Sequence, residues 1–195
     1  MERKKMTKAL IGESLKALMR EHPFEKITIK MITDEAGVIR PTFYNYFCDK
    51  YDVLEWIFSE SIIEKIKVMF EEGMYMEGIK MLFVCMKNDS QFYKKAFEVT
   101  GQNAFADIVK KYLYELFVEE FNAFYYVESR INNPLLSSDM VASYYAISLT
   151  NLLQAWIHDS FQEFTADQMF EAYEYLITHR VKDFIDPDRK GAAGK

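Results

Sequence analysis

The chain has 195 residues, of which half are apolar and 16% aromatic, and it carries a net charge of −6. This composition predicts a packed globular protein of one modest domain or two small ones, and it excludes a disordered chain. Residues 1–50 hold ten Lys or Arg against seven Asp or Glu, whereas residues 51–195 hold fourteen against twenty-three. The resulting +3 favours contact with an anion such as nucleic acid at the N-terminal end, and the −9 opposes it elsewhere.

The N-terminal segment predicts an amphipathic helix over about 3–21, which Pro23 brings to an end. The apolar face of this helix consists of Leu10, Leu15, Leu18 and Met19. Phe24 and Ile27 follow the proline, and we expect both to fill the core of a small three-helix head.

A short second helix is predicted after Thr28, which is a suitable N-cap. Ile29, Ile32 and Ala36 form one apolar stripe along it. Gly37 then allows a tight turn, because a residue without a Cβ adopts left-handed backbone readily.

The third predicted helix is also short, and its two faces differ in chemistry. Phe43 and Phe47 are one turn apart and are expected to face inward. The outer face carries Arg40, Pro41, Thr42, Tyr44 and Asn45. Two helices joined by a turn of roughly three or four residues with a Gly are typical of a helix-turn-helix, whose second helix enters the DNA major groove. The alternative is a helical hairpin in which the Gly turn is accidental.

At these positions the sequence resembles the DNA-binding signature of the TetR family of bacterial regulators. The resemblance covers about the first 55 residues and runs through Thr28, Ile32, Ala36-Gly37-Val38, Arg40–Phe47, Lys50 and Leu54. The continuation over 49–57 resembles the branch that contains regulators of dihydroxyacetone kinase operons. Ile39 departs from the pattern, since the family often has Ser or Thr there, and Ile cannot accept a hydrogen bond from the first helical turn.

The resemblance implies double-stranded operator DNA as the partner. Arg40, Thr42 and Asn45 are then expected to reach base edges, because Arg pairs well with guanine and Asn with adenine. Pro41 is expected to touch a thymine methyl group. The expected phosphate contacts, which set the docking register, are Thr28, Tyr44, Tyr46 and Lys50. For Tyr46, packing against the first helix is a competing role.

The rest of the chain predicts six further helices and no strand. Their ranges are about 49–73, 75–87, 91–100, 102–127, 139–161 and 165–184. The sequence therefore predicts an all-α fold of about nine helices. It divides into a helix-turn-helix DNA-binding domain over 1–48, a helical effector-binding and dimerisation domain over 49–185, and a disordered tail over 186–195. Composition also indicates a loop over 128–138.

In the family, the corresponding helices of the second domain enclose an effector pocket, so the resemblance implies a small-molecule effector. Aromatic side chains and Met are frequent on these helices, although at helical spacing plain core is the commoner role. Four amides fall at otherwise apolar positions: Gln102, Asn103, Asn151 and Gln154. A buried amide needs a partner, which a ligand can supply, whereas an exposed amide does not. The expected ligand-binding residues are Phe92, Phe97, Gln102, Asn103, Asn151 and Trp156.

The last two predicted helices have apolar faces wider than a helix pair in a monomer is expected to bury. These faces consist of Val141, Tyr144, Tyr145, Ile147, Leu149, Leu152, Leu153, Trp156, Met169, Phe170, Tyr173, Leu176 and Ile177. A homodimer in which each subunit adds both helices to a four-helix bundle would cover them, as in the family's dimers. The alternative is a helical hairpin buried within one chain.

Nothing in the sequence indicates catalysis. The three histidines, at positions 22, 158 and 179, are isolated, and neither a metal-binding spacing nor a Gly-rich phosphate loop occurs. We therefore expect no enzyme activity, no cofactor and no metal. Cys48 and Cys85 are far apart and predict free thiols in a reducing cytoplasm. No apolar segment follows the basic start and the longest apolar run, 81–86, is short, so neither a signal peptide nor a membrane span is expected.

Residues and resemblance together predict a dimeric, ligand-responsive transcription regulator that binds a palindromic operator. Repression released by a small molecule is the family's usual mode. One alternative is an activator that depends on a protein co-regulator. Another is a module without DNA recognition that binds only a ligand or a protein.

Overall fold

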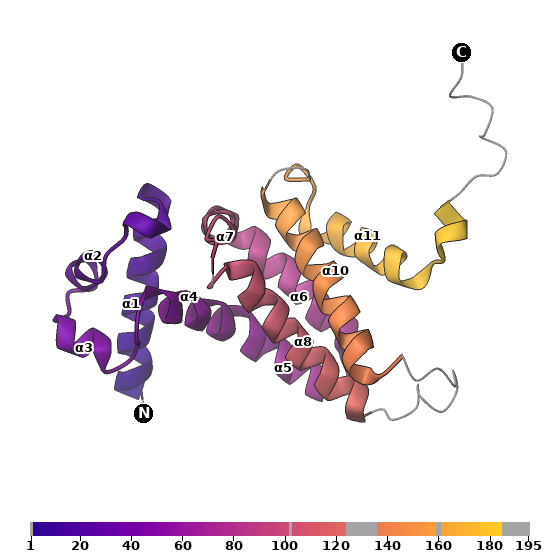
Figure 1. The fold of residues 1–195 in the computed structure, drawn as a ribbon, viewed down its shortest axis with the longest axis horizontal. Coiled ribbons are helices and arrows are strands. Elements are labelled where there is room, and N and C mark those ends of the chain that lie inside the picture. Colours follow the sequence, from indigo (N-terminus) through magenta and orange to yellow (C-terminus); the bar gives the residue numbers. More distant parts are fainter. Residues whose placement is uncertain (1, 102, 124–135, 159–160, 185–195) are drawn as a thin grey trace, which may run out of the picture.

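The computed structural model describes residues 2–101, 103–123, 136–158 and 161–184, and these ranges contain helices and loops but no strand. The chain forms a small head at one end and a larger body at the other, joined by one helix (Figure 1). The head contains α1 (Glu2–Glu21), a 3₁₀ turn (Phe24–Lys26), α2 (Ile29–Glu35) and α3 (Arg40–Tyr44). The all-α class predicted from the sequence is confirmed.

An aromatic core closes the head. Phe43 and Phe47 are buried, as their spacing predicts, and the Phe47 ring meets the Trp56 ring edge-on at 5.7 Å between centroids. A Cβ on Gly12 would lie 2.8 Å from the Trp56 ring, so this glycine lets α1 approach the joining helix closely. Burying a ring of this size contributes about 1.5–3 kcal/mol to the free energy of folding.

The helix that joins head and body, here called the connector, comprises α4 (Lys50–Phe58), a π-helical turn (Ser59–Ile63) and α5 (Glu64–Glu71). Counted as one helix, the connector brings the described residues to nine helices, the number predicted from the sequence. Asp49 is its N-cap, and the Asp49 carboxylate accepts from the backbone N–H of Tyr51 and Asp52 at 2.8 and 2.9 Å.

The π-helical turn is a feature that the sequence does not reveal. Within it, the consecutive residues Ile62 and Ile63 are both buried. The Ser61 hydroxyl donates to the Ile57 carbonyl at 2.5 Å and lies 3.1 Å from the Tyr93 hydroxyl. A side chain that inserts into the backbone hydrogen bonds of a helix is a known cause of a local departure from regular α-helical geometry.

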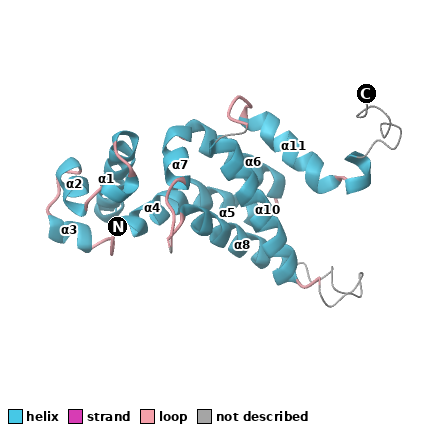
Figure 2. Ribbon diagram, turned by 45° about the horizontal axis from the view of Figure 1, so that its top comes forward, coloured by secondary structure: helices cyan, strands magenta, loops and turns pink. Residues whose placement is uncertain are grey.

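The body is a bundle of helices around a large apolar core. Its helices are α6 (Tyr75–Asn88), α7 (Ser90–Phe97), α8 (Phe105–Ala123), α10 (Ser138–His158) and α11 (Ala166–Thr178), and a 3₁₀ turn (Val181–Phe184) follows. α8 and α10 lie side by side over most of their length, and α11 packs mainly on α6 (Figures 1 and 2).

Some predicted helix ends need correction. The last helix ends at Thr178 rather than near position 184, because His179 has an extended backbone with φ −111° and ψ 152°. α7 ends at Phe97 rather than Thr100, and α8 begins only at Phe105, after Gly101 with φ +92°. The predicted tail over 186–195 and most of the predicted loop over 128–138 lie outside the described residues.

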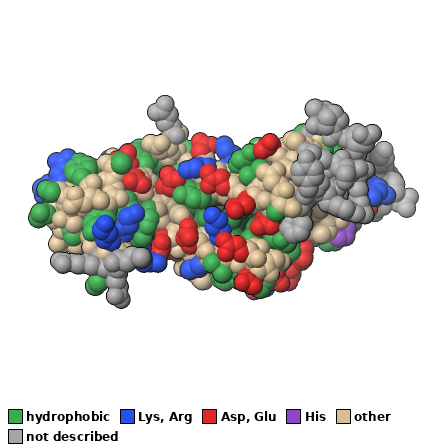
Figure 3. All heavy atoms as spheres, turned by 90° about the horizontal axis from the view of Figure 1, so that it is seen from below, with side chains coloured by type: hydrophobic (Ala, Val, Ile, Leu, Met, Phe, Trp, Pro, Cys, Tyr) green, Lys and Arg blue, Asp and Glu red, His purple; other side chains and the backbone are tan. Residues whose placement is uncertain are grey.

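Charge is distributed along the molecule as the sequence indicates. On the face shown in Figure 3, basic side chains gather at the head end and acidic ones over the middle of the molecule. None of the helices in the described ranges combines the length and apolar character that crossing a membrane requires. Within the same ranges, no three His, Cys, Asp or Glu side chains are grouped so that they could hold a metal ion.

Candidate nucleic-acid interface

The turn between α2 and α3 is centred on Gly37. This residue has φ +63°, a conformation that side chains with a Cβ rarely adopt. The backbone N–H groups of Gly37 and Val38 donate to the carbonyl oxygens of Asp34 and Thr33, at 3.3 and 3.0 Å. The closed turn places α3 against α2 while its outer face stays in solvent.

Thr28 occupies the start of α2, as predicted. Its hydroxyl oxygen accepts from the Met31 backbone N–H at 3.2 Å, and the side chain is exposed. This confirms the predicted N-cap. The hydroxyl hydrogen is not needed for the cap, so it can donate to a group outside the protein.

The outer face of α3 brings most of the predicted DNA-contacting residues together. Arg40, Pro41, Tyr44 and Asn45 are exposed, and Thr42 is half-buried. The Arg40 guanidinium donates to the Tyr44 hydroxyl at 3.2 Å, and its central carbon lies 5.6 Å from the centre of the Tyr44 ring. The contact with Tyr44 holds the Arg40 side chain along α3 in the free protein, and both groups remain open to solvent.

Ile39 stands at the N-cap of α3 and supplies no side-chain hydrogen bond. Its side chain is 69% exposed. The departure noted in the sequence therefore has a structural counterpart: the recognition helix begins without a side-chain cap and with an apolar group on its surface.

Tyr46 and Lys50 are less accessible than the residues of α3. Tyr46 is half-buried and packs against the head core, in keeping with the competing structural role. The Lys50 ammonium donates to the carbonyl oxygens of Phe24, Glu25 and Ile27 at 2.7, 3.2 and 2.9 Å. It also lies 4.6 Å from the centre of the Phe24 ring. A phosphate contact at Lys50 stays a prediction, and it would require some of these bonds to open.

Lys50 therefore ties the start of the connector to the 3₁₀ turn that follows α1. Burial lowers the pKa of the Lys50 ammonium, since leaving water disfavours the charge, and the three carbonyl oxygens replace the lost hydration. This role of Lys50 could not be predicted from the sequence, because its partners lie more than twenty positions earlier in the chain.

Replacing Lys50 with Met should lower the free energy of unfolding by about 1–3 kcal/mol, because three carbonyl groups lose a charged donor. The measurement is urea denaturation followed by circular dichroism. The matched control is Lys30→Met, since Lys30 is exposed and pairs with Asp34 on its own helix. The control should change stability by no more than about 0.5 kcal/mol. Equal losses in the two variants would contradict the structural role.

The residues predicted to bind an effector do not form one cavity. Phe92, Phe97 and Trp156 are buried in continuous core, where Phe97 meets the Phe105 ring at 5.0 Å. The amides of Asn103 and Asn151 are on exposed residues, and Gln102 lies outside the described residues. The burial of the aromatic residues agrees with the plain core role that the sequence left open, whereas Asn151 lines a groove described next. An effector site at these residues stays a prediction.

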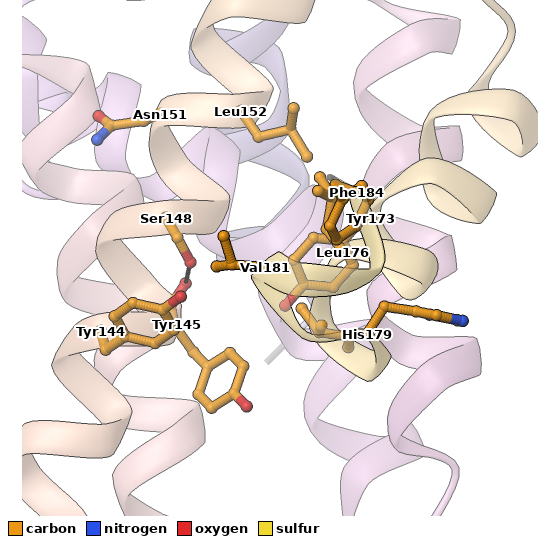
Figure 4. Close-up of a pocket in the computed structure, with 11 residues that line it drawn as sticks. Tyr144, Tyr145, Ser148, Asn151, Leu152, Tyr173, Leu176, His179, Val181 and Phe184 are labelled. Atoms are coloured by element: carbon orange, nitrogen blue, oxygen red, sulfur yellow. Dashed lines mark hydrogen bonds between the residues drawn. The ribbon is translucent and has the colours of Figure 1, made fainter. Parts of the chain in front are cut away.

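A groove of about 800 Å³ lies between α10 and α11. Figure 4 shows Tyr144, Tyr145 and Ser148 on α10, across the groove from Tyr173 and Leu176 on α11. Four of the residues that line the groove are exposed and apolar, namely Tyr144, Leu176, Val181 and Phe184. Met140, Ile147 and Tyr175 are further exposed apolar residues of α10 and α11. These exposed side chains favour the predicted dimer over a hairpin buried within one chain, and the dimer stays a prediction.

The head contains three helices, and its last helix, α3, follows a Gly turn and exposes its outer face. A head of this kind attached to a helical body defines a helix-turn-helix transcription regulator. Residues 13–57 match the family of bacterial regulatory proteins called the tetR family, and residues 75–179 match a transcriptional regulator C-terminal region. The chain belongs to the TetR family of transcriptional regulators.

Known proteins similar to this chain are regulators as well. The HTH-type dhaKLM operon transcriptional activator DhaS of Lactococcus lactis is 27% identical over 99 residues, which is 51% of this chain and 53% of DhaS. The chain thus matches about half the length of that relative. A solved structure of the dihydroxyacetone kinase operon activator DhaS has a TM-score of 0.66 at 20% identity, covering 92% of this chain and 98% of that one. The repressor FadR of Thermus thermophilus, solved with lauroyl-CoA, has a TM-score of 0.62 at 17% identity, covering 87% and 93%.

Proposed function

We propose that this TetR-family regulator is a cytoplasmic homodimer that binds palindromic operator DNA and responds to a small-molecule effector. The observation that carries the proposal is the outer face of α3. It presents Arg40, Pro41, Tyr44 and Asn45 to solvent on a helix of the kind that enters the major groove. Arg and Asn are the side chains that pair with guanine and adenine through two hydrogen bonds each.

The proposed dimer forms through α10 and α11. Their exposed apolar residues and the groove between them offer a surface that a second copy can cover. A two-fold arrangement places two heads on the same side, and a separation of roughly 34–36 Å lets both recognition helices enter successive major grooves. An effector then acts by favouring or disfavouring that separation.

Within this proposal the protein acts either as a repressor or as an activator. Repression released by an effector is the family's usual mode and is the first form. The relative in Lactococcus lactis is an activator of the dhaKLM operon, which favours activation, with or without a protein co-regulator, as the second form. Expression of a reporter from the bound promoter should rise on deletion of this gene if it represses, and fall if it activates.

Replacing Arg40 with Ala should weaken operator binding by about 1–3 kcal/mol, roughly 5- to 150-fold, and relax the preference at one base position. The measurement is a mobility-shift assay on genomic fragments, followed by titration of the best operator. Lys110→Ala is the control, since Lys110 is exposed on α8 and pairs with Asp107. If no genomic fragment binds, or if Arg40→Ala binds as tightly as the control, the result would favour the alternative of a module without DNA recognition.

A further inference from the structure

A second, smaller cavity lies in the body, and none of the predicted ligand-binding residues that the structure describes lines it. Its volume is about 270 Å³, and its wall comes from α5, α6, α8, α10 and α11. Six aromatic rings and one acid line most of it: Phe70, Tyr75, Phe117, Phe121, Tyr145, Tyr173 and Glu120. We call it the aromatic cavity.

The rings of the aromatic cavity contact one another in series. Phe70 meets Tyr75 edge-on at 5.4 Å and lies 6.4 Å from Phe117. Phe117 stacks on Phe121 at 6.1 Å, and Tyr145 lies 6.1 Å from both of these rings. Aromatic rings thus make up most of the cavity wall, and the negative face of such a ring attracts a cation positioned over it.

Glu120 is the charged residue among those that line the cavity. It is half-buried and accepts a hydrogen bond from the Tyr75 hydroxyl. Burial and the neighbouring Glu120 raise the pKa of Tyr75 above its usual range, so this hydroxyl keeps its proton and donates it. Residues 51–195 also carry a net charge of −9. The Glu120 carboxylate and the net negative charge of this part of the chain therefore oppose an anionic ligand and favour a cationic one.

We propose that the aromatic cavity binds a small organic cation, such as a substituted ammonium, with its charge beside Glu120 and its apolar groups against the rings. This inference rests on the proposed ligand-responsive function and specifies the chemical class of the effector. Rings alone would accept any apolar molecule of suitable size, and the carboxylate is what selects a positive charge.

The position of the cavity gives a bound cation contact with both the connector and the proposed dimer surface. Phe70 belongs to α5, the half of the connector that lies in the body. Tyr145, Tyr173 and Ile177 line the aromatic cavity and also the groove between α10 and α11. A ligand in the cavity therefore touches the connector and side chains of the proposed dimer surface at once, as coupling between effector and operator requires.

The experiment compares two probes of nearly the same shape on the purified full chain. Benzyltrimethylammonium carries a positive charge, and neopentylbenzene has carbon in place of its nitrogen and is neutral. Titration followed by calorimetry or tryptophan fluorescence should show the cation binding at least about tenfold more tightly. Glu120→Gln should abolish this difference, whereas Glu119→Gln, at the exposed neighbouring position, should preserve it.

Three results with these probes would overturn the proposal, and a fourth concerns laurate. They are no binding of the cation, equal binding of the two probes by the unchanged protein, and an unchanged preference in Glu120→Gln. Tighter binding of laurate than of the cation would assign the cavity to an apolar acyl ligand instead. None of these results depends on operator binding, which the Arg40 variant tests separately. Failure of the cation site can therefore be distinguished from failure of the proposed regulator.

Discussion

Replacing Leu176 with Asp should convert the proposed dimer into a monomer. Leu176 is 53% exposed on α11 and lines the groove that faces α10. In a two-fold dimer the substitution places two carboxylates in an apolar interface, each at a cost of several kcal/mol, because a charge there has no partner. Sedimentation at micromolar concentration should give about twice 23.1 kDa for the unchanged protein and about 23.1 kDa for the variant.

The same substitution should also greatly weaken operator binding, since a monomer engages one half-site at a time. Val68→Asp is the matched control, because Val68 is 59% exposed on α5 and does not line the groove. It should leave both the mass and the affinity unchanged. A monomeric unchanged protein, or a dimeric Leu176→Asp, would argue against assembly through α10 and α11.

Replacing Phe43 with Ala should lower the free energy of unfolding by about 3–5 kcal/mol, since the ring is fully buried and its removal leaves a cavity in the head. Operator binding should fall with it, because Phe43 fixes α3 to the head. Tyr44, the next residue, is 48% exposed and provides the control. Tyr44→Ala should cost less than about 1 kcal/mol in urea denaturation while still weakening DNA binding through a lost phosphate contact. Equal losses of stability would refute this division of roles.

Much of the head could be predicted from the sequence because its determinants are local, although Leu10, expected on the apolar face of α1, is 47% exposed. The cap at Thr28, the turn at Gly37 and the inward spacing of Phe43 and Phe47 all act within a few residues. Lys50 shows where local reasoning fails. Its partners are carbonyl groups at positions 24–27, and backbone acceptors have no signature in the sequence.

The body was harder to predict because a helical pattern does not fix how each helix is rotated. Asn103 and Asn151 lie at positions that look apolar from their neighbours, yet both are exposed. Glu119 and Glu120 are identical in chemistry and adjacent in sequence, but only Glu120 lines the aromatic cavity. Such differences depend on packing between distant helices, so the cavity became visible only in the folded chain.

The π-helical turn over Ser59–Ile63 also governs how the protein tolerates changes of length. An α-helix advances about 100° per residue, so removing one residue from a regular stretch turns everything beyond it by that angle. A π turn already accommodates one residue more than an α turn. Deleting a single residue inside Ser59–Ile63 would thus restore a plain α-helix and keep α4 and α5 in their present orientation. A deletion within α4 or α5 themselves would instead twist the head away from the body. Relatives of this protein that differ by one residue in the connector can therefore share its overall shape.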